Sequence, residues 1–583
     1  MTSLQRVPLG KRRLRLRKAS IPYLMLLPAM AVIMILMFYP IFNTFFYSLR
    51  NYVLTRKADW GFVGLQNYIS LFGDATFLKA LRNTAVWTLA NVLLQTFLGL
   101  MVALLLNRSF KGRGLVRALT FSPWAVGGML VALIWGFMMS ESVGVLNDLL
   151  MKLGFINQRI SWFSTEAMAM SAVIIANTWR GIPFFAVSIL SSLQTIPSEV
   201  YESAEVDGAR IFQKFFHITL PLIKETLVLT TLLRTIWTFN VVDIIFGMTR
   251  GGPNFATLTV PVYIMMIFND SLDMGYSSAV SVVMMMIIPL SSFKFLWKGE
   301  YLLMKPSAVK RIRRILSLYL PLTLLLIFTL FPFYWMLCTS FKVESSILQK
   351  NIEYFPSRFT LDNYTMMFSN MGFDSYFINS LFVSFTTTVL IMLMSALGGY
   401  ALARHNYKGK KLTFGILLIT QMLPGVVILV PLFQLFNKLS LINSLWSLVL
   451  TYATVNLPFC MITMSSFFAS IPRTLEEAAQ IDGCTMVGAI ARVVLPTLLP
   501  GLIATGAFAF VNAWNEFVYA LNFINSSKKF TLPVGLSMMK GEFTVNYGGL
   551  AAGCIIALIP VLALFAYIQK YLVSGLAAGA VKG

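Results

Sequence analysis

The sequence predicts an all-α polytopic membrane protein with about twelve transmembrane helices, arranged as two homologous six-helix halves that each carry a cytoplasmic helix–turn–helix. The composition is the first reason: 57% of the 583 residues are hydrophobic and only 12% are charged, about half the charged fraction of a soluble protein. Apolar runs of about 20 residues, the length that crosses a bilayer, recur throughout. The third reason is a repeat, in which a segment around Glu202 returns around Glu477.

The apolar runs fall into two sets of six. The first set covers 20–48, 83–106, 115–139, 167–193, 220–246 and 276–297, and the second covers 313–340, 376–403, 412–436, 443–469, 497–523 and 548–573. The runs are continuous and do not alternate with polar residues. This favours helices over barrel strands, because a helix satisfies its own backbone hydrogen bonds in lipid.

The net charge of +23 comes from basic clusters that lie beside the predicted spans. These are KRRLRLRK (Lys11–Lys18), NRSFKGRGLVR (Asn107–Arg117), KPSAVKRIRR (Lys305–Arg314) and RHNYKGKK (Arg404–Lys411). Lys and Arg accumulate on the cytoplasmic side of membrane proteins. We therefore expect both termini to be cytoplasmic in a bacterial or archaeal inner membrane, and a charge-driven nucleic-acid role is excluded. The first span lacks a signal-peptide cleavage pattern and is expected to remain.

Cysteine and histidine do not indicate a metal or catalytic site. Cys338, Cys460, Cys484 and Cys554 have neither metal-ligand nor disulfide spacing, and we interpret them as small packing residues. His217 and His405 both fall in predicted cytoplasmic segments and do not suggest a catalytic pair. We therefore expect no metal, no bound cofactor and no catalytic residues.

The internal repeat keeps a constant displacement of 275 residues, the distance from position 202 to position 477. Glu202, Ala204, Asp207, Gly208, Leu220 and Pro221 return as Glu477, Ala479, Asp482, Gly483, Leu495 and Pro496. Asn240 likewise returns as Asn515. Pro40 matches Pro332 at a displacement of 292, so the first half carries 17 extra residues in between. Two homologous halves, 1–303 and 304–583, are expected, and the basic flank that follows Met304 suggests that two separate chains were joined here.

The repeated segments, about 196–221 and 471–496, predict a helix–turn–helix. Residues from Glu199 to Asp207 suit a helix, Gly208 breaks it, and Leu220-Pro221 opens the next span. Apolar Ile211, Phe212, Phe215 and Phe216 follow the turn, and the small residues Ser203, Ala204, Gly208 and Ala209 are expected at the surface, with Ala478 at the position of Ser203. Thr474 and Glu477 have capping-box spacing. An ordinary loop is the alternative, but two copies with fixed spacing favour a docking element.

This pattern resembles the EAA coupling motif of ATP-binding-cassette importer permeases, with ESA in the first copy and Val493 in place of isoleucine in the second. The resemblance implies that each segment inserts into one of two cytoplasmic ATPase subunits. The implied core docking positions are Glu202, Ala204, Gly208, Glu477, Ala479 and Gly483. The chain has no G-x-x-x-x-G-K-[ST] loop, so ATP and magnesium are expected on the partners and the chain is not expected to be an enzyme.

Further stretches narrow the resemblance. FVGLQNYISLF (Phe62–Phe72), WRGIPF (Trp179–Phe184) and FNVVDIIFGMTRGGP (Phe239–Pro253) resemble the first permease of maltose-type carbohydrate importers. TSFK (Thr339–Lys342), LDNYTMMF (Leu361–Phe368) and WNEFVYAL (Trp514–Leu521) resemble the second. The resemblance implies a carbohydrate substrate delivered by an extracytoplasmic solute-binding protein. The two permeases, normally separate chains, are fused here.

Polar side chains in the fifth span of each half are the candidates for the substrate pathway, since such groups are costly in a membrane. They are Arg234, Asn240 and Asp243 in one half and Asn512, Asn515 and Glu516 in the other, with Trp237 and Trp514 nearby. Amides, carboxylates and aromatic faces suit sugars, although these groups are also suited to pairing between helices. Asn240 and Asn515 are favoured because they are related by the repeat. Arg234 suits either an acidic sugar or a structural ion pair.

An ion-coupled secondary transporter is the alternative function, because such proteins are also built from related six-helix halves. It requires acidic residues at the membrane midplane, whereas Asp243 and Glu516 fall towards the outer ends of their spans. It also leaves the two docking segments without a purpose. ATP-driven uptake, as opposed to uptake driven by an ion gradient, discriminates between the two.

Overall fold

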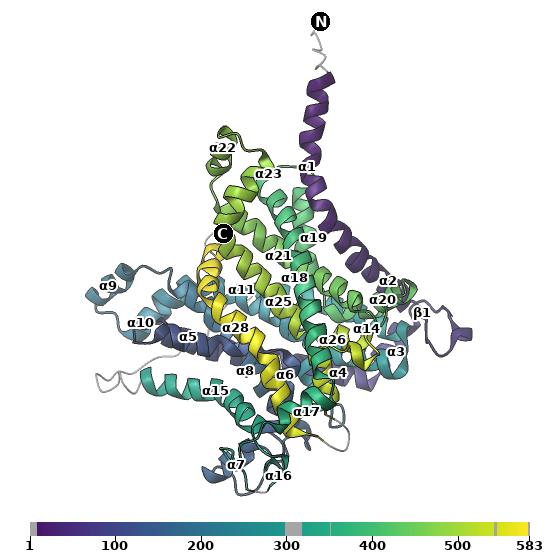
Figure 1. Ribbon diagram of the computed structural model, residues 1–583, viewed down its shortest axis with the longest axis vertical. Coiled ribbons are helices and arrows are strands. Elements are labelled where there is room, and N and C mark those ends of the chain that lie inside the picture. Colours follow the sequence, from purple (N-terminus) through teal and green to yellow (C-terminus); the bar gives the residue numbers. More distant parts are fainter. Residues whose placement is uncertain (1–8, 298–317, 350, 541–544, 581–583) are drawn as a thin grey trace.

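The computed structural model describes residues 9–297, 318–349, 351–540 and 545–580, and its regular structure is almost entirely helical (Figure 1). The predicted all-α polytopic membrane fold is confirmed. Within those ranges the only sheet is a small antiparallel ribbon of β1 (Arg50–Asn51) and β2 (Gly61–Phe62), which the sequence analysis did not anticipate. Met304, the proposed junction, lies outside the described residues, as does the basic cluster of residues 305–314.

The first half follows the predicted order of spans. Its helices are α1 (Leu9–Ile33), continued by a π-turn at Met34–Phe38 and by α2 (Tyr39–Ser48), then α3 (Gln66–Gly73), α4 (Ala75–Asn107), α5 (Arg113–Phe121), α6 (Gly128–Met138), α7 (Val145–Lys152), α8 (Glu166–Leu193), α9 (Ser198–Val206), α10 (Ile211–Lys214), α11 (Leu220–Phe239), α12 (Asp243–Thr249), α13 (Val260–Met266) and α14 (Met274–Trp297). The long helices α4, α8 and α11 match predicted spans two, four and five.

The second half repeats this order. It comprises α15 (Leu320–Ser340), α16 (Glu344–Ile347), α17 (Asp362–Asn370), α18 (Phe373–Arg404), α19 (Lys410–Met422), α20 (Gly425–Lys438), α21 (Leu445–Ser470), α22 (Thr474–Ile481), α23 (Met486–Ala489), α24 (Leu495–Thr497), α25 (Leu499–Asn515), α26 (Val518–Phe523), α27 (Leu532–Met538) and α28 (Tyr547–Ala580). Helices α15, α18, α21 and α28 are the unbroken candidate spans of this half.

Several predicted continuous spans are broken, which corrects the sequence analysis. The predicted spans 115–139 and 412–436 each bend sharply, by 98° between α5 and α6 and by 99° between α19 and α20. The predicted spans 220–246 and 497–523 each end at an asparagine before a short further helix, and the second also bends by 72° before Leu499. Over the described residues, eight helices are long and apolar enough to cross a membrane, or up to eleven when each bent pair counts once.

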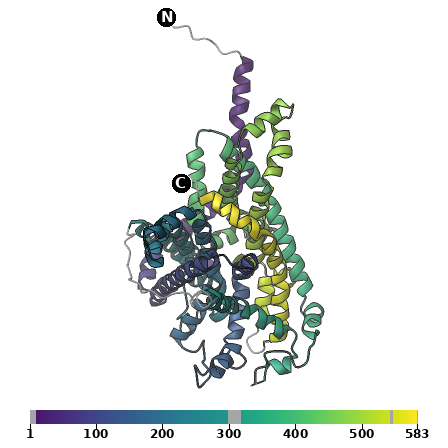
Figure 2. The ribbon, with the colours of Figure 1, turned by 90° about the vertical axis from the view of Figure 1, so that its left-hand side faces the viewer.

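The first span of each half packs against the other half. Helix α1 contacts α18 and α21, and the Tyr23 hydroxyl donates a hydrogen bond to the Lys408 carbonyl at 2.9 Å. In return α15 contacts α5 and α6, and the Trp179 indole N–H of α8 lies 3.2 Å from the Phe328 carbonyl. Figure 2 shows the two halves side by side, with purple α1 running along the green helices. The halves are therefore repeats in sequence but not separate bodies.

Matching hydrogen bonds confirm the repeat independently of sequence. The Asn67 amide donates to the carbonyls of Ser48 and Arg50, and the Asn363 amide donates to those of Ser340 and Lys342. In the same way Thr84 accepts from the Val260 N–H and Ser380 accepts from the Leu532 N–H. Asn67 and Asn363 tie the short helix before a long span to the end of the preceding span. Thr84 and Ser380 tie the long span itself to a later segment of the same half. Capping otherwise unpaired backbone groups in this way stabilises both halves alike.

The length difference between the halves is concentrated in one connection. The chain between α6 and α8 runs over 139–165 and contains α7, whereas the chain between α20 and α21 covers only 439–444. Asp148 of α7 accepts a hydrogen bond from the Tyr354 hydroxyl of the second half at 2.7 Å. Figure 1 places α7 and α16 together at one end of the molecule. The extra residues therefore form part of a contact between the halves.

The repeated asparagines predict unequal losses of stability. Asn363→Ala removes a buried amide with two hydrogen bonds, and we expect a cost of about 1–3 kcal/mol. Asn67→Ala, at a half-buried position, is expected to cost less. Thermal unfolding of the purified protein in detergent measures both, with exposed Thr365→Ala and Gln66→Ala as matched controls. Equal midpoints for Asn363→Ala and Thr365→Ala would contradict a shared anchoring role.

Candidate functional site: paired docking segments and a broken-helix pathway

Both repeated segments fold as the predicted helix–turn–helix. In the first copy α9 and α10 flank Gly208, and in the second α22 and α23 flank Gly483. The two glycines have φ angles of +77° and +89°, in the left-handed region that favours glycine. A Cβ built on either one meets nothing within 4 Å. Both turns are therefore open on their outer side, with room for another protein to approach.

The docking segments also expose large aliphatic side chains that the sequence analysis missed. Val206 is 89% exposed and its repeat partner Ile481 is 85% exposed. Each stands two residues before the turn glycine. In Figure 1 both segments project from the outside of the bundle, away from α7 and α16. Exposed apolar groups at matched positions are typical of an interaction surface, and their identical place in the repeat was the available signal.

Two alanines of the motif point inward, which corrects the expectation of a small-residue surface. Ala204 is only 9% exposed and Ala479 only 7% exposed. Glu202, Ser203 and Gly208 are exposed, as expected. On an amphipathic helix the alanine position faces the chain itself, so its small size allows the docking helix to pack closely on the bundle. Ala204 and Ala479 do not line the outer face.

The expected capping box at Thr474 and Glu477 is not formed, because Thr474 is already the first helical residue and no side chain caps α22. The neighbouring Glu476 instead anchors the helix. Its carboxylate accepts from the Arg404 Nε at 2.7 Å and from the Tyr400 hydroxyl at 2.9 Å. Both side chains of this ion pair are about nine-tenths buried. The second docking segment is thus fixed to the end of α18.

The first docking segment is held differently. The repeat position of Glu476 is Tyr201, whose hydroxyl lies 3.0 Å from the Thr219 hydroxyl. Lys214 pairs with Glu205 and joins α10 to α9. Beside the second segment, burial and then the charge of Arg473 lower the pKa of His405 below its ordinary value. The two docking segments have the same helix–turn–helix fold, but different side chains attach them to the rest of the chain.

A π-turn follows each docking segment at matching positions. It covers Phe215–Thr219 in the first half and Ile490–Val494 in the second. The Leu-Pro pair comes directly after, so the proline lies in the first turn that follows, where its missing N–H is tolerated. In the first half this gives an apolar helix that extends over Ile211–Phe239. Helix α10 of the first docking segment is therefore continuous with α11, whereas α9 is separated from it by the turn at Gly208.

The breaks in the spans meet where polar side chains pair with freed backbone groups. The Asn515 amide donates to the Ala125 carbonyl of the other half at 2.9 Å. The Arg180 Nε donates to the Val126 carbonyl at 3.0 Å. A Cβ at Gly127 would lie 2.6 Å from the Asn515 Oδ1. Irregular backbone at membrane depth must be satisfied by protein or line a cavity, and glycine allows the close approach that this requires.

The acidic residues of the fifth spans contact helix amides or glycine. The Glu516 carboxylate accepts from the Tyr519 and Ala520 amides at 2.8 and 3.2 Å, at the start of α26. Asp243 lies against Gly128, where an added Cβ would be 1.9 Å from its Oδ2. The Arg180 Nη1 is 3.9 Å from the same Asp243 oxygen. Both carboxylates therefore have local structural partners.

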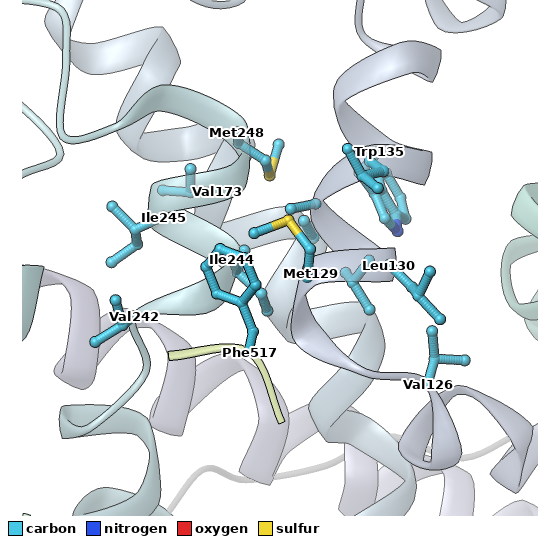
Figure 3. Close-up of a cluster of buried hydrophobic side chains, with 14 of the residues drawn as sticks. Val126, Met129, Leu130, Trp135, Val173, Val242, Ile244, Ile245, Met248 and Phe517 are labelled. Carbon is cyan, nitrogen blue, oxygen red and sulfur yellow. The ribbon is translucent and has the colours of Figure 1, made fainter. Parts of the chain in front are cut away.

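An apolar cluster fills the space beside these polar groups. Figure 3 shows Phe517 of the second half beside Ile244 and Met129 of the first. The Phe517 and Phe246 rings are 5.8 Å apart between centroids. These side chains are buried, except Phe246, which is half-buried. The segments after the breaks thus form a shared apolar cluster with side chains from both halves.

The two favoured asparagines have the same incomplete hydrogen bonding. Asn240 donates to the Ile236 carbonyl of its own helix at 2.8 Å, while Asn515 donates across to Ala125. The amide oxygens of both asparagines are buried without a hydrogen-bond partner. An unpaired buried acceptor costs free energy and is a position where the hydroxyl of a substrate would donate.

The other residues predicted to line the substrate pathway fall into two groups. Some have only packing or structural contacts, and one remains a candidate for substrate contact. Trp514 is 1% exposed, and its indole N–H donates to the Ala557 carbonyl at 3.1 Å, so its assignment to the pathway is wrong. Asn512 donates to the Asn456 Oδ1 at 2.9 Å and links α25 to α21. Trp237 is half-buried and packs on Phe184 with ring centroids 4.8 Å apart. Trp237 therefore remains with Asn240 as a pathway candidate.

Comparison with known proteins places the chain in a family. Residues 95–298 and 394–577 both match the family described as binding-protein-dependent transport system inner membrane component. The chain belongs to this family. It is a multi-pass inner-membrane permease, and the double match confirms the two predicted permease units.

Single permease proteins similar to this chain align over nearly their whole length with about half of it. The sulfoquinovosyl glycerol transport system permease protein SmoH of Agrobacterium fabrum is 42% identical over 265 residues, 46% of this chain and 93% of SmoH. The trehalose/maltose transport system permease protein MalF of Thermococcus litoralis is 36% identical over 289 residues, 50% of this chain and 97% of MalF. A solved bacterial ABC transporter involved in alginate import gives a TM-score of 0.41 at 20% identity, over 46% of this chain and 99% of that one. The permease here is two such units fused.

The buried ion pair predicts a specific weakness of the second docking segment. Glu476→Ala leaves the Arg404 guanidinium buried without its partner, and we expect a loss of about 3–5 kcal/mol. Thermal unfolding and hydrogen exchange of residues 474–483 measure it, with exposed Glu477→Ala as the matched control. Adding Arg404→Ala to Glu476→Ala is expected to cost less than the sum of the two single changes. Additive costs would show that the pair does not anchor α22.

Proposed function

We propose that this permease is the translocating component of an ATP-driven importer, which takes a carbohydrate from an extracytoplasmic solute-binding protein. The observation that carries the proposal is the pair of matched docking segments, each with an open left-handed glycine and an exposed aliphatic residue. A translocating chain without a nucleotide-binding loop needs a partner to use ATP. One ATPase subunit at each segment, with ATP and magnesium bound to that subunit, meets this need.

The carbohydrate substrate is supported by the names of the relatives and by the chemistry of the site. SmoH, MalF and the diacetylchitobiose permease DasC of Streptomyces coelicolor are each named for transport of a sugar or sugar derivative. The unpaired amide oxygens of Asn240 and Asn515 accept hydrogen bonds from hydroxyl groups. The half-buried Trp237 offers an aromatic face to C–H groups.

Orientation in the membrane follows from charge and from the docking role. Lys and Arg are concentrated in the cluster from Asn107 to Arg117 and in its repeat from Arg404 to Lys411. The positive-inside rule places these loops, the docking segments and both termini in the cytoplasm. The binding protein then meets the opposite face, at the end of the molecule that carries α7 and α16 (Figure 1). Uptake into sealed vesicles that requires ATP and is insensitive to ion gradients tests the importer against secondary transport.

The symmetry-related asparagines are expected to contact the substrate. Asn240→Ala and Asn515→Ala each remove an amide, and a neutral hydrogen bond is worth about 0.5–1.5 kcal/mol. We expect a several-fold change in uptake with normal assembly of the transporter. Uptake per assembled complex measures the effect. Normal transport by both variants would assign the two residues a purely structural role.

The turn glycines are expected to lie closest to the ATPases. Leu at Gly208 or Gly483 costs about 1–2 kcal/mol in the left-handed region, and its side chain points into open space outside the chain. We therefore expect insertion of the spans to persist while ATP-driven uptake is lost, and we expect the double variant to release both ATPases. ATPase co-purification and uptake are measured together.

Gly112→Leu and Gly409→Leu are the matched controls for these variants. Both glycines have positive φ and an open Cβ position, but they lie in loops outside the docking segments. They carry the same backbone strain, and we expect normal coupling. Normal uptake and ATPase retention in the Gly208, Gly483 and double variants would show that these turns are not the coupling element.

A further inference from the structure

A buried guanidinium lies inside the fifth span of the first half. Arg234 is 8% exposed, and its Nε donates to the Gln95 Oε1 at 2.6 Å. Gln95 is oriented by its own donation to the Asn177 carbonyl at 3.0 Å. Asn91 accepts from the Asn177 amide at 2.9 Å and completes a neutral network. The arginine is thus held by amides, and within the described part of the chain its two terminal nitrogens donate to no protein acceptor.

No carboxylate within 4 Å balances this charge among the described residues. Asp243 belongs to the same predicted span as Arg234, but its carboxylate lies against Gly128 and Arg180. Glu516 accepts two amides at the start of α26. The structural ion pair that the sequence left open for Arg234 is therefore not formed. A buried cation without a counterion is costly, and in membrane proteins such groups mark substrate pathways.

A second arginine and two aromatic rings accompany Arg234. Arg180 precedes Phe184 by one turn of α8, and Arg234 precedes Trp237 by three residues of α11. The Phe184 and Trp237 rings touch, with centroids 4.8 Å apart. Consecutive spans run in opposite directions, so the aromatic pair lies between the two guanidinium groups along the bundle. Anionic groups suit the arginines, and the C–H faces of a sugar ring suit the aromatics.

The second half shows that the fold does not require these charges. Pro183 and Pro458 occupy matching places in α8 and α21, at the displacement of 275 residues that also relates Asn240 to Asn515. At the same displacement Arg180 corresponds to Val455 and Arg234 to Ala509. Ala509 is fully buried in the second half. The same architecture is thus built there with apolar residues.

We propose that Arg234 binds an anionic group of the transported sugar, a carboxylate or a sulfonate, as the substrate passes the broken spans. This inference rests on the proposed carbohydrate function and adds the charge of the substrate to it. Arg180 lies one turn beyond the aromatic pair and receives the anion before or after Arg234. A planar guanidinium binds two oxygens of a carboxylate or sulfonate at once, which a neutral amide does not.

The test uses the complete transporter, the chain with its ATPases and its binding protein, in proteoliposomes. The probes are a 6-sulfonated glucoside and a glucuronoside, each compared with the matched neutral glucoside. We expect the wild type to take up at least one anionic probe about tenfold faster than its neutral counterpart, the scale of a charge-assisted hydrogen bond. Arg234→Ala, which copies Ala509, is expected to remove that preference, and Arg234→Lys to restore part of it.

Controls separate recognition from structure. Thr235→Ala changes the adjacent residue, whose hydroxyl bonds only within its helix, and should leave the preference intact. Arg234→Gln replaces Arg234→Ala if the latter does not assemble with the ATPases. The same binding protein is used throughout, so a change in preference reports the permease. Equal wild-type uptake of charged and neutral probes, or an equal loss of both in Arg234→Ala, overturns the proposal. ATP-driven uptake of no sugar at all overturns the carbohydrate function itself.

Discussion

The architecture depends on satisfying backbone carbonyls where helices break inside the membrane. The amide of Asn515 bonds to the Ala125 carbonyl across the two halves, and the Tyr519 hydroxyl donates to the Gly425 carbonyl at the break between α19 and α20. Without such partners an irregular segment at this depth is unfavourable, because lipid offers no hydrogen bonds. The breaks therefore persist only where side chains from neighbouring spans reach them.

The chain leads from each docking segment directly to one of these breaks. In the first half the chain passes from α9 and α10 through a π-turn into α11 and ends at Asn240, and in the second it passes from α22 and α23 through a π-turn and a 72° bend into α25 and ends at Asn515. Each docking segment therefore precedes, along the chain, the helix that ends at one of the two asparagines related by the repeat. Helices α1 and α15 each pack on the opposite half, so the two halves are also joined by one exchanged span from each.

The sequence predicted the structure correctly where the relevant pattern is local or occurs twice in the chain. Apolar length predicted the spans, and the displacement of 275 residues located both docking turns at Gly208 and Gly483. The left-handed conformation of these glycines came from the structure. It did not predict the breaks after Phe239 and Asn515, because the hydropathy of these segments continues across them. Burial of Ala204 was missed for a similar reason: a small residue suits either a surface or a close contact, and only the tertiary structure decides. The anchor at Glu476 depends on Arg404, distant in sequence, and no local spacing indicates that pair.

The two halves share one fold but differ in how the docking helix is anchored and in the charge of two positions in the fourth and fifth spans. The second half anchors α22 with a buried ion pair and has apolar Val455 and Ala509 at the positions that the repeat relates to Arg180 and Arg234. The first half has a tyrosine in place of that anchoring carboxylate, but carries the two arginines at the corresponding positions of its fourth and fifth spans. A buried charge is tolerated only where its surroundings are rigid and polar, and the Asn91, Gln95 and Asn177 network supplies this in the first half alone. Fusion of the two units in one chain keeps them in equal number, so every molecule contains both the half with the two arginines and the half in which the Arg404–Glu476 ion pair anchors α22.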